Sequence, residues 1–347
     1  MRFRFLHIGL ILSVMAAAFT GCALVDENLT DCEANHRLNY EIRLVTNMTT
    51  ELQTQLSMAA DVQVSTALQA YLGNVFTDYA HDVNLSFYDV FGDSLRLHHE
   101  AHQMEASQSK YTLFIPVREY MHVAVANMDL VPGLELVGDE KCHAARLQQE
   151  VRDTVESFKT GVFTARLPMH IKEGMDQEFD VKLYTASSVH AVVLDTLGSH
   201  IKDIKVFSTG FATSFNLADS VFHYSFTPVV RDEEVEVGDT PGNPLCFASV
   251  TFPSRNPSST KVIINNDDEF VTESADESLW RCKVYATLPD GSITETVLGV
   301  KLPLLPGEFK IIKCTVTNDG STSPKAPWVG ASVTLNWNDQ PAWNVEI

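Results

Sequence analysis

The feature that most constrains the fold of this 347-residue chain is the alternation of apolar and polar residues along much of its length. Every second side chain is apolar in residues 38–44, 83–90 and 111–117. Successive side chains of a β-strand point to opposite faces, so this period of two predicts strands with one buried face. Turn-forming groups such as Pro289-Asp290-Gly291 favour hairpins between them. The chain is therefore predicted to be mostly β and to form β-sandwiches. Further strands are expected at 161–167, 178–194, 204–208, 245–252, 261–265, 279–288, 295–302, 309–316 and 331–337.

One segment departs from this pattern. In residues 61–80 the apolar side chains recur every three or four positions, which places them on one stripe of a helix facing a core. This segment is the one long helix that the sequence predicts, and it falls in the N-terminal half.

The N-terminus has the three-part layout of a secretory signal peptide. Two arginines precede an uncharged apolar run, Ile8 to Phe19, that is shorter than the ~20 residues needed to span a bilayer. Phe19-Thr20-Gly21-Cys22 then resembles the bacterial lipobox, in which the cysteine receives a lipid and becomes the first residue of the mature protein. An ordinary cleavage with an incidental Cys22 is the alternative. We expect a signal peptide over 1–21 with lipid on Cys22, and a polar tether over 22–31.

The mature length is enough for two domains of about 150 residues each. No Pro/Gly/Ser linker separates them. A polar, turn-like segment at 173–176 precedes a second series of strands, so we expect an N-terminal β-sandwich domain over 32–176 and a C-terminal one over 177–347.

The formal charge of −20 disfavours nucleic acid as a partner, because the phosphate backbone would be repelled. The acidic residues are dispersed, as on a solvated surface.

Five cysteines remain once Cys22 is acylated, so they cannot all pair. Alternation places Cys282 and Cys314 on apolar strand faces, as small core residues. Cys32 and Cys142 lie in polar surroundings, and an exported compartment would permit a disulfide between them. Sequence alone does not fix that pairing.

The best candidate for a metal site is a histidine-rich segment. On a strand, His98, Glu100 and His102 would share one face, and imidazole with carboxylate suits a transition metal. The favoured interpretation is a solvent-facing sheet edge, with Leu95 and Leu97 on the buried face, so no metal is predicted.

The usual signatures of catalysis are absent from the sequence. It has no Gly-x-Ser-x-Gly elbow, P-loop, dinucleotide fingerprint, His-Glu-x-x-His helix or EF-hand loop, so no catalytic residue and no cofactor are predicted. A hydrolase whose carboxylates come from distant segments is a remaining alternative. A surface glycan-binding lipoprotein is another, and would need a row of exposed aromatic rings, for which the candidates are Trp280, Trp328, Trp337 and Trp343.

Several segments together resemble the FimB-type fimbrial anchor subunits of Bacteroidales: Cys22, Asp31-Cys32, residues 38–51, and residues 332–337 near the end of the chain. The resemblance implies two tandem transthyretin-like β-sandwich domains. It also implies assembly with other fimbrial subunits by exchange of β-strands, with the chain held by its lipid at the surface of the outer membrane. Strand exchange is a form of β-augmentation, in which an extended segment of one subunit completes the sheet of another.

Shaft subunits of the same superfamily lose their lipid and first strand when a protease cuts after an arginine. Arg37 and Arg43 are the possible sites here. Arg43 falls inside a predicted strand and Arg37 just before it, so poor access favours the uncut anchor over the shaft. A tip subunit is a further alternative.

Overall fold

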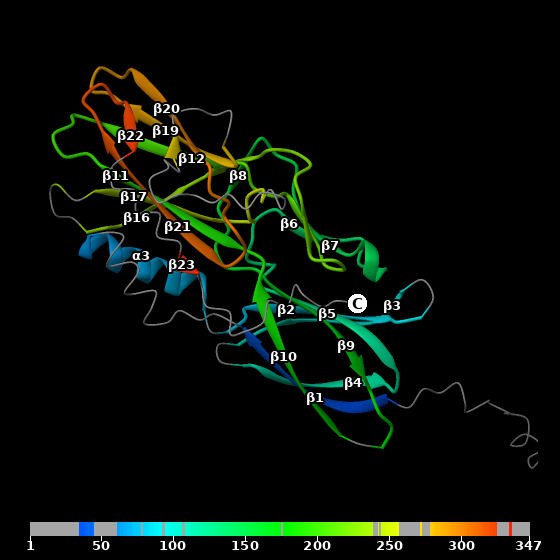
Figure 1. Cartoon of the computed structure of the whole chain (residues 1–347). Coiled ribbons are helices and arrows are strands. Elements are labelled where there is room, and N and C mark those ends of the chain that lie inside the picture. The colour runs from blue at the N-terminus through cyan, green and yellow to red at the C-terminus, as the bar shows by residue number, and fades with distance from the viewer. Residues whose placement is uncertain are drawn as a thin grey trace, which may run out of the picture.

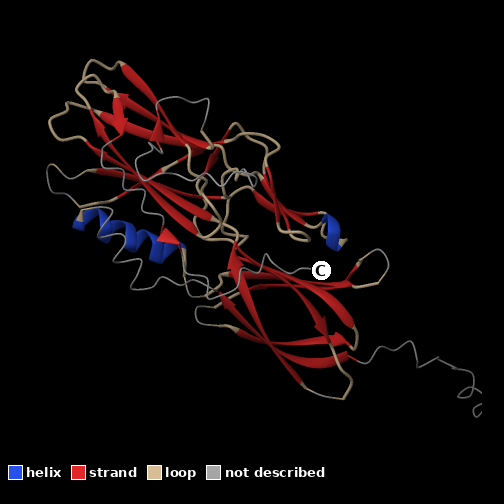
Figure 2. Cartoon of the chain, viewed as in Figure 1, coloured by secondary structure: helices blue, strands red, loops and turns tan. Residues whose placement is uncertain are grey.

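The computed structural model describes residues 35–44, 61–77, 79–91, 94–105, 108–174, 176–238, 242, 244–256, 271–272, 278–324 and 333–334. Within them the chain is mostly β, as predicted, and α3 (Val62–Val75) is the one α-helix. None of the helices in this part of the chain is long and apolar enough to cross a bilayer. Figure 1 shows strands stacked in layers at two ends of an elongated molecule, and Figure 2 separates them from the helix by colour.

The first sandwich is made by a seven-stranded sheet that folds over on itself (Figure 1). Two of its neighbouring strands, β9 and β10, pair only through Tyr184↔Thr164 and Thr185↔Phe163. The sheet turns at that point, so one layer faces the other across a core. The order is β3 (Arg96–Gln103), β2 (Asp82–Asp89), β5 (Glu119–Ala126), β9 (Phe163–His170), β10 (Gln177–Thr185), β1 (Asn35–Leu44) and β4 (Lys110–Pro116).

The second sandwich consists of two facing sheets whose inner side chains, including Val192, Trp280, Val284 and Ile312, form a separate core. One sheet has the order β16 (Glu233–Val235), β17 (Leu245–Thr251), β11 (Ser188–Asp195), β21 (Glu308–Val316) and β22 (Thr322–Pro324), and β23 (Val333–Thr334) also pairs with β21. The other has the order β18 (Val271–Thr272), β20 (Ile293–Val300), β19 (Trp280–Thr287), β12 (Asp203–Thr209), β15 (Val229–Arg231) and β8 (Thr154–Glu156).

A small four-stranded sheet lies between the sandwiches on one side (Figure 1). Phe215 of this sheet lines a hollow together with Arg166 of β9 and with Lys182 and Tyr184 of β10, so the sheet lies against the first sandwich. Its order is β14 (Val221–His223), β13 (Ser214–Asn216), β7 (Arg146–Gln149) and β6 (Leu134–Val137), and the 3-10 turn η1 (Cys142–Ala144) precedes β7.

The strands do not divide between the sheets at residue 176. β10 begins at Gln177, beyond the expected boundary, yet it pairs with β9 and β1 of the first sheet. β8 precedes the boundary and pairs in parallel with β15 of the second sandwich. Alternation identifies a strand but carries no information about its partner, and parallel partners are distant in sequence.

The predicted helix is present, but it does not cover the N-terminal sandwich. Asp61 caps it by accepting a hydrogen bond from the Val64 amide at 2.9 Å. Its buried stripe includes Leu68 and Leu72. The helix contacts β16 and lies beside β16 and β17 in Figure 1, so it runs along a sheet of the second sandwich. The prediction that the helix belongs to the N-terminal domain was therefore wrong. The stripe identifies the buried face of a helix without identifying the sheet that covers it.

Candidate functional site

Strand β1, the described strand closest to Cys22, occupies an interior position in the first sandwich. It pairs in parallel with β10 from Leu38 to Leu44 and antiparallel with β4 from Asn35 to Glu41. Its side chains Leu38, Tyr40 and Ile42 point into the core and are at most 4% exposed. Removing β1 would open the sheet between β10 and β4 and uncover that part of the core.

A buried hydrogen bond ties β1 to the opposite layer. The Tyr40 hydroxyl lies 2.5 Å from Nε2 of His122 on β5, while Nδ1 of His122 lies 3.0 Å from the Ser86 carbonyl oxygen on β2. A carbonyl can only accept, so Nδ1 carries the proton, and Nε2 accepts from Tyr40. Both ring nitrogens of His122 are thus satisfied in the neutral form.

Burial sets the protonation of this pair. It lowers the pKa of His122 to about 4, with the Ser86 carbonyl opposing the shift, and it raises the pKa of Tyr40 well above its ordinary value. At neutral pH both groups are therefore uncharged. Sequence reasoning missed them, although an inward-facing Tyr120-x-His122-x-Ala124 pattern in an apolar strand was a usable signal of a buried histidine.

Charged side chains line the outer face of β1. Glu41 contacts Lys110 of β4 at 3.0 Å, and the hydrogen bond from Lys110 lowers the pKa of Glu41. Arg43 contacts Asp180 of β10 at 3.2 Å. Arg37 lies inside β1, opposite Phe114 of β4, and not before the strand as expected. Both candidate cleavage sites are therefore in paired strand.

The histidine-rich segment forms β3, and His98, Glu100 and His102 share one face as predicted. The Glu100 carboxylate lies between the two imidazoles, 2.8 Å from Nε2 of His98 and 2.7 Å from Nε2 of His102. In the described part of the chain, no three His, Cys, Asp or Glu side chains are placed so that they could hold a metal ion together.

The orientation of β3 is opposite to the expected one. Leu95 and Leu97 are 48% and 42% exposed, whereas His98 packs on Phe87 and His102 stacks on Tyr111. The partly buried face carries the imidazoles because aromatic rings of β2 and β4 cover it.

Two of the cysteines lie where alternation placed them, whereas Cys142 is buried although its sequence neighbours are polar. Cys282 and Cys314 are fully buried in the second core, as predicted. Cys142 is buried in η1, where burial raises the pKa of its thiol. Cys22 and Cys32 lie outside the described residues, so lipidation and the Cys32–Cys142 disulfide stay predictions.

A Ser-His-Asp group in the second sandwich was not foreseen. Asp232 accepts hydrogen bonds from the hydroxyls of Ser208 at 2.8 Å and Ser249 at 2.7 Å, and lies 3.2 Å from Nε2 of His190. A catalytic triad needs serine and carboxylate on different imidazole nitrogens, but here both contact Nε2. The His190 and Asp232 side chains are also fully buried, so the group is structural.

Of the four tryptophans proposed for a glycan platform, Trp280 lies in the described part of the chain, and it is buried. Trp280 is 1% exposed and donates its indole N–H to the Leu302 carbonyl at 2.9 Å. Trp328, Trp337 and Trp343 lie outside the described residues.

Several solved structures are similar to this chain. A candidate adhesin from Bacteroides ovatus has a TM-score of 0.51 at 10% identity, over 85% of this chain and 95% of that one. A candidate polysaccharide-binding protein from Bacteroides thetaiotaomicron has a TM-score of 0.49 at 10% identity, over 84% and 98%. The fimbrial anchor protein Mfa2 from Porphyromonas gingivalis has a TM-score of 0.47 at 10% identity, over 86% and 100%.

The fold is thus shared with the Bacteroides ovatus protein over nearly the whole length of both chains. No family model matches the sequence, and no curated protein does.

Proposed function

We propose that this protein is a fimbrial subunit that keeps a lipid on Cys22, attaches the fibre to the outer membrane and terminates it by exchange of β-strands. The main support is the position of β1, which is paired on both edges and fixed to β5 through Tyr40. Because Cys22 precedes β1 in the chain, a lipid retained there would be linked directly to a strand of the first sandwich. Fimbrial proteins and candidate adhesins are among the solved structures similar to this chain.

The anchor role is favoured over the shaft role by the position of the two arginines. A protease needs several residues of accessible extended backbone, and both arginines lie in a strand whose backbone is paired. We also propose that the two sandwiches are transthyretin-like domains in tandem, joined between β10 and β11. No catalytic residue or cofactor is assigned.

The first test is the N-terminus of the native protein, measured by mass spectrometry. An acylated chain that begins at Cys22 supports the anchor. A chain that begins at Leu38 or Leu44 would show processing after arginine and replace the anchor with the shaft role.

The second test is release of fibres from cells. Cys22→Ser should shed intact fibres into the medium, whereas the control Thr20→Ser keeps the small-residue cleavage site and should leave them attached. Fibres that stay on the cell in the Cys22→Ser strain would contradict lipid anchoring.

A further inference from the structure

The outer face of β12 and β19 carries aromatic and cationic side chains in a regular arrangement. Val206 of β12 and Val284 of β19 point into the core, so their neighbours point outward. Cross-strand pairing sets Phe207 beside Lys283 and Lys205 beside Tyr285. The rings of Phe207 and Tyr285 meet edge to face, with centroids 5.7 Å apart. The four side chains form a platform of two rings and two ammonium groups.

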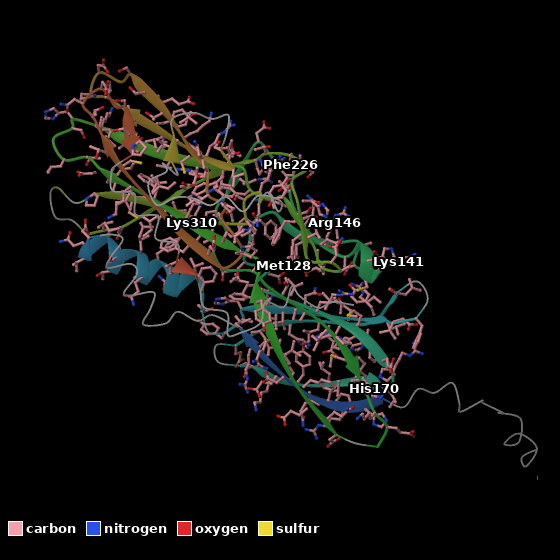
Figure 3. All side chains as sticks on the ribbon, in the orientation of Figure 1. Met128, Lys141, Arg146, His170, Phe226 and Lys310 are labelled. Atoms are coloured by element: carbon pink, nitrogen blue, oxygen red, sulfur yellow. The ribbon has the colours of Figure 1, made fainter. Side chains whose placement is uncertain are left out.

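One hollow lies on this face and a second lies at the end of the same two strands, where β12 ends and β19 begins. One of about 420 Å³ is lined by the platform together with Thr154 and Ile293. The other, of about 270 Å³, is lined by Thr209 and Arg281, the next outward pair along the same two strands, and by Tyr224, Phe226 and Arg255. The Arg255 guanidinium lies 5.3 Å above the centre of the Tyr224 ring. Phe226 is on the segment between β14 and β15 (Figure 3).

We call the platform together with the two hollows the outer strip. Basic residues line this strip, whereas the whole protein is acidic. The chain has 45 acidic and 25 basic residues, but the lining of the two hollows contains four basic residues and no carboxylate. Two carboxylates share this face: Glu295, the cross-strand partner of Tyr285, lies 3.2 Å from Lys283, and Asp203 lies 4.0 Å from Lys205. The four basic residues outnumber these two acids, so an excess of positive charge remains. The strip is therefore complementary to an elongated anionic ligand.

The strand pairing restricts the kind of ligand. β19 is paired with β12 and β20, and β12 is paired with β15 at residues 207–209, so the stretch that carries Phe207, Lys283 and Arg281 has no free edge on which an extended peptide could add. A ligand must bind through side chains, by packing on the rings and by ion pairs with ammonium and guanidinium groups.

We propose that this strip binds a carboxylated polysaccharide. The apolar faces of its sugar rings pack on Phe207 and Tyr285, while its carboxylates pair with Lys205, Lys283 and Arg281. The larger hollow has the size of a small-ligand site, and the smaller one follows it at the end of the same two strands, as required for successive sugar units. This site would give the fimbrial subunit a ligand-binding surface that involves neither β1 nor Cys22.

The test is calorimetric titration of the purified mature chain with hexagalacturonate, with maltohexaose as the neutral sugar control and hexaglutamate as the acidic peptide control. Hexagalacturonate should bind at least tenfold more tightly than either control. Absence of hexagalacturonate binding would overturn the proposal. Equal binding of hexaglutamate would assign the strip to acidic protein segments and overturn it as well.

Charge reversal locates the site. Lys205→Glu with Lys283→Glu should weaken hexagalacturonate binding at least tenfold. The matched control, Lys172→Glu with Lys182→Glu, makes the same change in net charge on residues of the first sandwich or next to it and should keep the affinity within twofold. Equal losses in the two double variants would mean that only net charge matters, which would refute a site on β12 and β19.

Discussion

Acid is expected to destabilise the protein through His122, whose imidazole is buried and neutral in the folded state. Its pKa is about 4 when folded, because of burial, and about 6.5 when unfolded. Between these values the unfolded chain binds a proton that the folded chain does not. The stabilisation is therefore complete above pH 6.5 and is lost as the pH falls toward 4. The difference between the two pKa values corresponds to about 3 kcal/mol in total, and about 2 kcal/mol of it is already lost at pH 5.

The assay is urea denaturation of the wild-type protein and of His122→Gln at pH 7.5 and pH 5. Glutamine is neutral at both values, and all other titrating groups are common to the two proteins. The difference in their free energy of unfolding should therefore shrink by about 2 kcal/mol at pH 5. Tyr40→Phe removes the hydrogen bond but leaves the imidazole buried, so it should keep the acid sensitivity. If the difference between wild type and His122→Gln does not change with pH, the assignment of a buried neutral imidazole is wrong.

Three further predictions concern the packing. Leu68→Ala on α3 should lower the free energy of unfolding by about 2–5 kcal/mol in urea titrations, whereas Leu97→Ala on the exposed face of β3 should change it by less than about 0.5 kcal/mol. Gly161→Ala should lower the free energy of unfolding by about 1–3 kcal/mol, because the new Cβ would lie 2.5 Å from the Phe76 ring. Adding Phe76→Leu to this variant should recover part of its thermal stability. Asp232→Ala should cost about 3–5 kcal/mol by calorimetry, since a buried imidazole and two hydroxyls lose their acceptor; a change below 1 kcal/mol would contradict that role.

The local structure of this chain could be predicted from its sequence far better than its strand partners. The period of two identified β1, β2 and β4 within a few residues, because alternating burial is a local property of one strand. The helix was found for the same reason. The partner of a strand depends on residues that are distant in sequence. β10 was assigned to the second domain because it follows a turn, but its parallel pairing with β1 places it in the first sheet.

The candidate sites show the same limit. His98, Glu100 and His102 were correctly placed on one face, but which face is covered depends on Phe87 and Tyr111 from other strands. The Tyr40–His122 hydrogen bond joins residues 82 positions apart, and the cations of the outer strip come from several segments. Such groups can be identified only from the assembled sheets.

The two proposals depend on different parts of the molecule and on different chemistry. β1 contributes its backbone to both neighbours and its side chains to the first core, whereas the inner faces of β12 and β19 belong to the second core. A strand position that is filled from the N-terminus is suited to the proposed attachment, because a lipid on Cys22 would then be joined to a paired strand. A paired sheet face with rings and cations is suited to ligands that need no backbone contact. Since mutations in separate cores usually act independently, changes that weaken the hold on β1 should leave the outer strip intact. Attachment and recognition can therefore be altered separately in this fold.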